Sequence, residues 1–181
     1  MSDSHLTPDV SDHDHVDGTR DAQATLLEYG DYECPYCGMA YPIVKELQRR
    51  FMGHMRFAFR NFPLSESHPH AEHAAESAEA VADLGGNTPF WAMHDALYEN
   101  QNALDDESLA DYARDLGVDG GAVARALATG AYRARVRADF KSGVRSGVNG
   151  TPTFFINGAR FDGDWHNVEE FAQALQGALV G

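Results

Sequence analysis

The chain's two cysteines, Cys34 and Cys37, stand three positions apart, and the elements expected around them constrain the fold most strongly. Residues 24–29 (Ala-Thr-Leu-Leu-Glu-Tyr) are apolar and rich in strand formers, which predicts a buried strand. Apolar side chains recur at helical spacing over residues 35–51, so we expect a helix that begins directly after Cys34. Pro35 suits a first helical turn because its missing N–H would have no partner there. The cysteine pair is therefore predicted to lie at the junction of a strand and a helix.

The rest of the chain predicts an α/β fold that is interrupted by a block of helices. Residues 55–60 alternate as a strand does, so residues 24–60 are typical of a strand, helix, strand crossover unit. Residues 69–147 are almost wholly helical in pattern, with a stripe of alanines in the first helix. Three further elements are expected near the C-terminus: a strand at 153–157, a hairpin strand at 159–162 and a helix at 167–179.

These patterns also predict the domain organisation of the 181 residues. Residues 21–66 and 148–181 would form the α/β domain, and residues 67–147 an inserted all-helical subdomain. Residues 1–20 are polar and acidic, so we expect a flexible arm, because such a composition cannot bury a core. A weak metal-binding tail built on the histidines of this arm is the alternative.

The chain is strongly acidic, with 28 Asp and Glu against 14 Lys and Arg and a formal net charge of −14. Such a surface repels phosphate backbones and anionic membranes, so we expect neither nucleic acid nor a membrane as a partner. No run approaches the roughly 20 apolar residues of a membrane span. The N-terminal residues lack the pattern of a signal peptide, which predicts a cytoplasmic protein, or an exported one if a leader was trimmed.

Cys34 and Cys37 have the spacing that disulfide exchange requires. Cys34 would lie at the positive end of the helix dipole, near unpaired backbone N–H groups, which favours its thiolate and lowers its pKa. Cys37 lies one turn further into the helix and should be more covered. We therefore predict that Cys34 is the attacking thiol and Cys37 the resolving thiol, and we expect no cofactor.

Three other interpretations of the cysteine pair stay open. The first is a soft-metal binding protein or metallochaperone that holds zinc or copper with Cys34, Cys37 and His70, although the chain has no second cysteine pair. The second is a glutathione-linked transferase or isomerase, which the presence of a resolving cysteine argues against. The third is a redox-inert binding module.

Glu28 stands inside the apolar strand, six residues before Cys34. Burial would raise the pKa of its carboxyl group, so that the group could hold or accept a proton near neutrality. We predict that Glu28 accepts the proton of Cys37 during exchange. The alternative is a glutamate at the end of a strand that faces water.

Two distant segments together resemble the DsbA-like branch of the thioredoxin superfamily. The first runs from Glu28 to Gly38 and contains Cys34-Pro35-Tyr36-Cys37, and the second is Gly150-Thr151-Pro152-Thr153-Phe154-Phe155-Ile156-Asn157-Gly158. The helical block between them is similar to that branch as well. The resemblance covers roughly residues 22–180, and it implies a thioredoxin fold with an inserted helical subdomain.

The resemblance also implies roles for individual residues. Cys34 would be the nucleophile and Cys37 the resolving thiol, and Glu28 matches a buried acid of the family. A cis peptide bond would precede Pro152, and the Thr151 backbone would bind an extended substrate chain by strand addition. Pro35 and Tyr36 would contribute to substrate binding.

The resemblance implies partners but leaves the direction of the reaction open. Cysteine-containing proteins would be the substrates, and glutathione or a dedicated reductase or oxidase would be the redox partner. Tyr36 stands where the exported oxidases of this family usually carry a histidine, and the pair Pro35-Tyr36 resembles glutaredoxins instead. The missing histidine removes a group that would stabilise the thiolate, so an oxidase, a reductase and an isomerase all remain possible.

Overall fold

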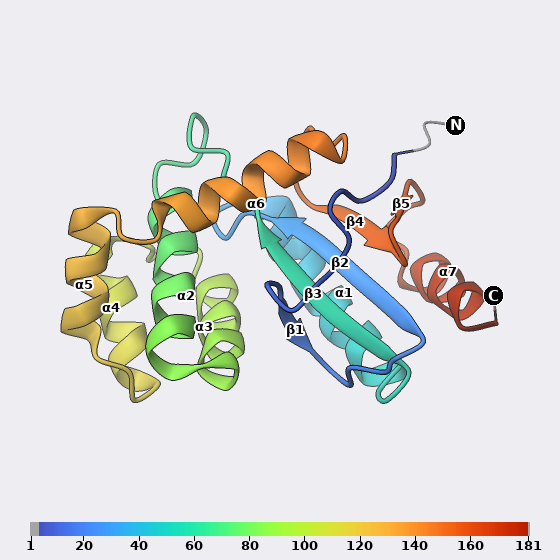
Figure 1. Ribbon diagram of the computed structural model, residues 1–181, viewed down its shortest axis with the longest axis horizontal. Helices are drawn as coiled ribbons and strands as arrows, with labels where there is room; N and C mark the ends of the chain where they lie inside the picture. Colours follow the sequence, from blue (N-terminus) through green and yellow to red (C-terminus); the bar gives the residue numbers. More distant parts are fainter. Residues whose placement is uncertain (1–3, 181) are drawn as a thin grey trace.

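A computed structural model describes residues 4–180, in which five strands form one mixed sheet with seven helices around it (Figure 1). The sheet has the order β1-β3-β2-β4-β5. The strands are His15–Asp17 (β1), Ala24–Gly30 (β2), Met55–Asn61 (β3), Thr153–Ile156 (β4) and Ala159–Phe161 (β5). The helices are Pro35–Arg50 (α1), Ala71–Gly85 (α2), Asn87–Glu99 (α3), Asp106–Asp115 (α4), Gly120–Thr129 (α5), Arg133–Arg145 (α6) and Val168–Val180 (α7).

The centre of the sheet is the crossover unit expected from the sequence. Strands β2 and β3 are parallel and α1 connects them, whereas β4 pairs antiparallel with β2 on its other side. The turn between β4 and β5 contains Asn157 and Gly158, which both have positive φ angles, 47° and 83°. Asparagine and glycine tolerate this conformation at little cost, so the sequence at this point specifies the hairpin.

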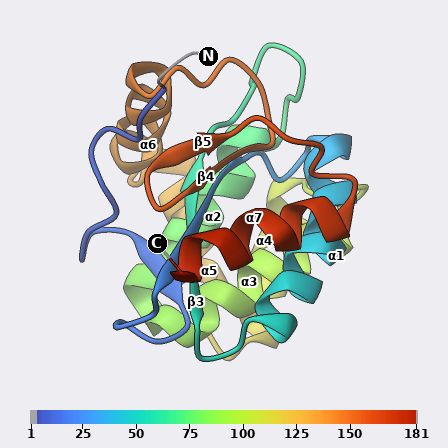
Figure 2. The ribbon, with the colours of Figure 1, turned by 90° about the vertical axis from the view of Figure 1, so that its right-hand side faces the viewer.

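Alternating side chains of the strands supply two separate cores, one on each face of the sheet. Leu26 belongs to the core that contains Leu47 of α1 and Phe171 of α7, whereas its neighbour Leu27 belongs to a second core with Phe155. Figure 2 shows α7 crossing one face of the sheet, while α6 lies on the other side. The sheet is therefore covered on both faces, and its central strands β2 and β3 are buried almost throughout.

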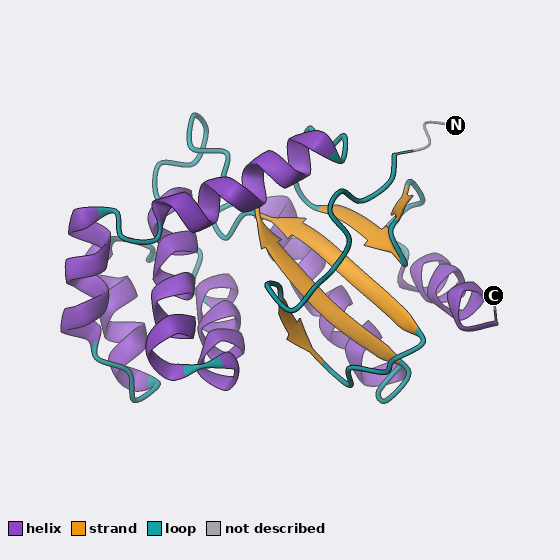
Figure 3. Ribbon diagram, in the orientation of Figure 1, coloured by secondary structure: helices purple, strands orange, loops and turns teal. Residues whose placement is uncertain are grey.

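The helical block lies beside the sheet rather than on it, as Figures 1 and 3 show. Helices α2 to α5 pack on one another, and the alanine stripe of α2 is buried among them. Helix α6 then returns to the sheet and contacts β3. This arrangement confirms the predicted α/β fold with helices inserted between its two halves.

The N-terminal segment differs from the flexible arm that was expected for residues 1–20. Strand β1 pairs antiparallel with β3, and Leu6 is buried in the second core. The carboxylate of Asp14 pairs with the buried guanidinium of Arg60 at 2.7 and 3.0 Å. The unpaired edge of β3 binds this segment as a strand, and the buried charge of Arg60 binds its counter-ion Asp14. The composition of residues 1–20 does not indicate either interaction. Residues 1–3 lie outside the described range.

Candidate active site

Cys34 occupies the position directly before α1, with φ −69° and ψ 123°, and Pro35 begins the helix. The pKa of its thiol is lowered to about 5. The hydrogen bond from the Cys37 thiol is the largest cause, burial opposes it, and the backbone N–H groups of Cys37 and Tyr36 lower the pKa further. Residue Cys34 is only 4% exposed.

Cys37 is fully buried one turn further along α1. Burial raises the pKa of its thiol well above the usual value, and the hydrogen bond with Cys34 and the charge of Glu28 act in the same direction. The backbone N–H of Asp31 points to its Sγ at 3.5 Å. Both cysteines are free thiols, so the structure represents the reduced state, with one acidic thiol next to one that holds its proton.

The loop before β4 brings the second sequence motif to Cys34. The Sγ of Cys34 lies 3.6 Å from the carbonyl oxygen of Thr151, which accepts a hydrogen bond from the thiol form of Cys34. The peptide bond between Thr151 and Pro152 is cis, the geometry that the resemblance implies. The hydroxyl of Thr151 is buried and has no hydrogen-bond partner among residues 4–180. The two motifs, far apart in sequence, therefore form one site.

Glu28 lies inside β2 and is only 2% exposed, so it does not face water at the end of the strand. Its neighbours in the sheet are Phe59 on β3 and Phe154 on β4, which exclude water from its carboxyl group. Burial, followed by the charge of Cys34, raises the pKa of Glu28 to about 8. Its Oε1 atom has no hydrogen-bond partner within the described chain. A carboxyl group in this state can gain or lose a proton near neutrality.

The surface around the cysteines is apolar where α1 begins. Pro35 is exposed, and Tyr36 and Met39 are 59% and 52% exposed. Large apolar side chains that stay in solvent beside a reactive group indicate a contact surface. The helix start therefore combines an acidic thiol with an uncovered apolar rim.

Three residues for which the sequence predicts no role in thiol chemistry support the site. The buried carboxylate of Asp31 accepts hydrogen bonds from His68 and from two backbone N–H groups. The side-chain amide of Gln101 donates to the carbonyl oxygens of residues 32 and 34, both at 2.9 Å. An aspartate just after a strand is typical of a turn, which was the available signal for Asp31. His68 and Gln101 reach the site from distant segments, and no sequence pattern marks them.

The metal-site interpretation finds no further ligand beside the cysteines. Among residues 4–180, no group of three or more histidine, cysteine, aspartate or glutamate side chains is arranged to hold a metal ion. His70 contacts the site through its backbone, because its N–H donates a hydrogen bond to the Glu33 carboxylate at 2.7 Å. The structure therefore favours thiol chemistry over metal binding at Cys34 and Cys37.

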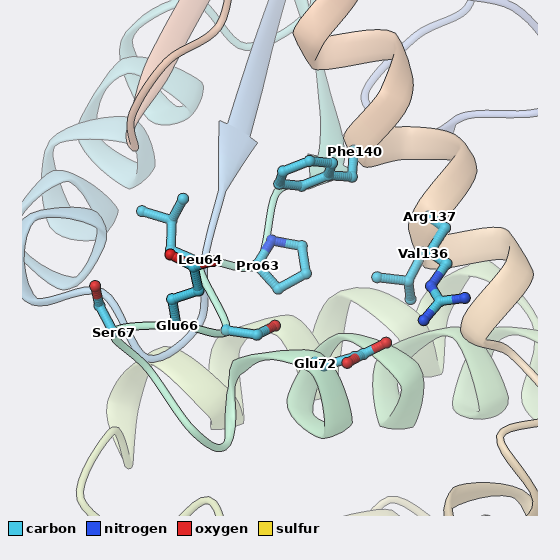
Figure 4. A pocket seen from close by; sticks show the side chains of 9 residues that line it. Pro63, Leu64, Glu66, Ser67, Glu72, Val136, Arg137 and Phe140 are labelled. Carbon is cyan, nitrogen blue, oxygen red and sulfur yellow. The ribbon is translucent and has the colours of Figure 1, made fainter.

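A hollow of about 540 Å³ lies between the β3–α2 loop and helices α2 and α6 (Figure 4). Pro63 and Leu64 of the loop and Val136 and Phe140 of α6 line it, and Glu72 and Arg137 add charged groups to its lining. Neither cysteine nor Glu28 lines this hollow. The hollow is therefore separate from the thiol site.

A family model described as Thioredoxin matches residues 10–177. The chain belongs to the thioredoxin family. Among solved structures, BdbD from Bacillus subtilis matches with a TM-score of 0.86 and 24% identity, covering 93% of this chain and 94% of that one. MdbA from Corynebacterium diphtheriae, described as a thiol-disulfide oxidoreductase, matches with a TM-score of 0.71 and 20% identity over 95% of both chains. Wolbachia pipientis α-DsbA1 matches with a TM-score of 0.78 and 16% identity over 94% of both chains. These likenesses confirm the predicted DsbA-like fold.

The curated relatives are much longer proteins. The Na⁺/H⁺ antiporter NhaA 1 of Salinispora arenicola is 42% identical over 176 residues, which are 97% of this chain and 26% of that protein. The antiporter NhaA of Nitrosospira multiformis is 39% identical, over 97% of this chain and 28% of its own length. The chain thus spans about a quarter of the length of these relatives. Within residues 4–180, no helix has both the length and the apolar character that crossing a membrane requires.

Proposed function

We propose that this thioredoxin-family chain is an enzyme that exchanges disulfides with cysteine-containing proteins. The observation that carries the proposal is the difference between its two adjacent thiols. The pKa of Cys34 is lowered to about 5, whereas the pKa of the buried Cys37 is raised well above its usual value. At neutral pH the first sulfur is therefore a thiolate, which is the nucleophile in disulfide exchange, and the second keeps its proton.

The exchange takes place in two displacements at sulfur. The Cys34 thiolate attacks one sulfur of a substrate disulfide, the substrate S–S bond breaks, and the other substrate sulfur leaves as a thiolate. Cys37 then gives its proton to the ionised fraction of Glu28 and attacks the Sγ of Cys34. The second substrate sulfur leaves, so the substrate is reduced by two electrons and a Cys34–Cys37 disulfide forms. The same steps in reverse oxidise a dithiol substrate.

Glu28 suits the proton transfer because its pKa of about 8 lies between those of an ordinary carboxyl group and the Cys37 thiol. Its negative charge raises the pKa of Cys37, which shows that the two groups are electrostatically coupled. When Glu28 takes the proton, its carboxyl group becomes neutral. The Cys37 thiolate then has no carboxylate charge beside it in this apolar surrounding. We infer that Glu28 holds the Cys37 proton while the mixed disulfide resolves.

The substrate is proposed to be an extended protein segment that contains a cysteine. The exposed side chains of Tyr36 and Met39 offer it an apolar contact beside Cys34. The Thr151 backbone, whose carbonyl oxygen lies 3.6 Å from the Cys34 sulfur, offers it main-chain hydrogen bonds. Glutathione or a dedicated reductase or oxidase would then return the enzyme to its starting state. In a reducing compartment the cysteine pair would be held as two thiols, and the protein would act as a reductase.

Cysteine variants test this function through two different readouts. Insulin reduction and dithiol-peptide oxidation are measured for the wild type, Cys34→Ser and Cys37→Ser. Cys34→Ser should fall to the uncatalysed rate, whereas Cys37→Ser should capture substrate as a mixed disulfide that dithiothreitol releases. A Cys34→Ser variant that keeps wild-type activity would refute the proposal.

A further inference from the structure

Asp31 connects the two cysteines to the rest of the site. Its side chain is fully buried, and the carboxylate accepts hydrogen bonds from the N–H of Glu33 at 2.8 Å and of Leu64 at 2.9 Å. Its backbone carbonyl accepts the N–H of Cys34 at 3.1 Å, and its backbone N–H points to Sγ of Cys37. A negative charge held at this position, three residues before Cys34, opposes the formation of a thiolate there.

His68 lies on the β3–α2 loop and pairs with this carboxylate. Its Nδ1 is 2.7 Å from Oδ2 of Asp31, and its side chain is 19% exposed, so the ring can exchange protons with solvent. Burial lowers the pKa of His68, but the hydrogen bond and charge of Asp31 outweigh it, and the charges of Cys34 and Glu33 raise the pKa further. The charges that raise the pKa of His68 most strongly thus come from acidic groups of the segment before α1.

We propose that His68 is a positioning residue of the thiol site, whose protonated ring compensates the charge of Asp31 and thereby favours the Cys34 thiolate. The inference rests on the proposed function, since it concerns the same nucleophile. Tyr36 between the cysteines carries no positive charge, so the compensating cation comes from a different segment of the chain. The ring also fixes the Asp31 carboxylate that holds the turn before the helix.

Electrostatic coupling between two titrating groups is reciprocal. Because the Cys34 thiolate favours the protonated form of His68, the protonated ring must favour the thiolate by the same free energy. The effect is present at pH values below the raised pKa of His68 and is lost as the pH rises through it. Over that interval the thiolate loses a stabilising charge and the reduced state becomes less favourable.

The test compares His68→Gln with a matched control, His73→Gln. His73 forms a similar pair with Asp106, Nδ1 to Oδ1 at 2.6 Å, but that pair joins α2 to α4 and contains no residue of the thiol site. The pKa of Cys34 is measured from the rate of iodoacetamide alkylation against pH, and the potential from equilibration with glutathione. His68→Gln should raise the Cys34 pKa by about half a unit or more and shift the equilibrium towards the disulfide. His73→Gln should leave both quantities at their wild-type values.

A double variant separates charge compensation from a structural role. Asp31→Asn combined with His68→Gln removes both charges, so it should bring the Cys34 pKa back towards the wild-type value. A His68→Gln variant with the wild-type Cys34 pKa would overturn the inference, as would a double variant with no recovery. These alkylation measurements concern ionisation alone, so their outcome is distinguishable from loss of disulfide exchange in Cys34→Ser.

Discussion

The Sγ of Cys34 lies 3.6 Å from the carbonyl oxygen of Thr151, a residue 117 positions further along the chain. All the helices of the inserted block lie between these two residues in sequence, and helices α2 to α5 stand beside the sheet (Figure 1). The loop before β4 reaches Cys34 because β4 pairs directly with β2, the strand that leads to the cysteine. The pairing of β2 with β4 thus assembles the site.

The hydrogen bond from Cys37 is expected to control the acidity of Cys34. Replacing Cys37 with alanine removes the largest cause of the low Cys34 pKa, which should then rise from about 5 towards that of an ordinary thiol. Cys37→Ser, which keeps a hydroxyl donor, should stay closer to the wild type. The measurement is the alkylation rate of Cys34 against pH. Equal pKa values in the alanine variant and the wild type would contradict this account.

Glu28 is expected to make the reduced protein less stable as the pH rises. Its pKa is raised in the folded state from 4.5 to about 8, so its contribution is fully present below pH 4.5 and is lost as the pH rises through 8. Glu28→Gln removes this loss. As the pH rises, the free energy of unfolding of the variant should therefore increase relative to that of the wild type, by at most about 1.4 kcal/mol per pH unit. Urea denaturation under reducing conditions at several pH values measures the difference. A difference that is constant from pH 5 to 8 would show that Glu28 does not titrate there.

A side chain at Gly30 is expected to destabilise the fold. A Cβ atom there would come within 2.5 Å of the Phe59 ring and 2.7 Å of the Tyr98 hydroxyl, and both rings are buried. Gly30→Ala should therefore lower the free energy of unfolding by about 1–3 kcal/mol. Gly177→Ala is the control, because α7 has open space at that position and alanine favours a helix by about 1 kcal/mol. Thermal or urea unfolding of both variants checks the prediction, which fails if Gly30→Ala is as stable as the wild type.

The N-terminal segment is expected to contribute to stability through Asp14. The side chains of Asp14 and Arg60 are 5% and 4% exposed, so Asp14→Ala would leave a buried guanidinium without its counter-ion and cost about 3–5 kcal/mol. Asp12→Ala breaks a pair with Arg20 whose side chains are 83% and 80% exposed, and it should cost less than about 1 kcal/mol. Urea denaturation at neutral pH compares the two variants. Equal small losses would show that the segment is not held by this ion pair.

The sequence determined the local features of this protein. The position of a thiol at the start of a helix follows from the sequence around Cys34: a strand before it, then Pro35 and a helical periodicity after it. Each of these patterns involves only residues that are close in the sequence. The same holds for the Asn157-Gly158 hairpin and for the helical block, whose elements have strong local patterns. The apolar neighbours of Glu28 in its strand also indicated its burial correctly.

The tertiary structure decided the contacts between distant segments. Asp31 receives His68 from a loop 37 residues away, and Gln101 caps the cysteine turn from beyond α3, although neither position carries a local pattern. The N-terminal segment differs from the expected flexible arm for the same reason, since it pairs with the edge of β3 and with the buried charge of Arg60. Local periodicity reports which face of an element is apolar, whereas the partner of a buried polar group is fixed only when the whole chain has packed.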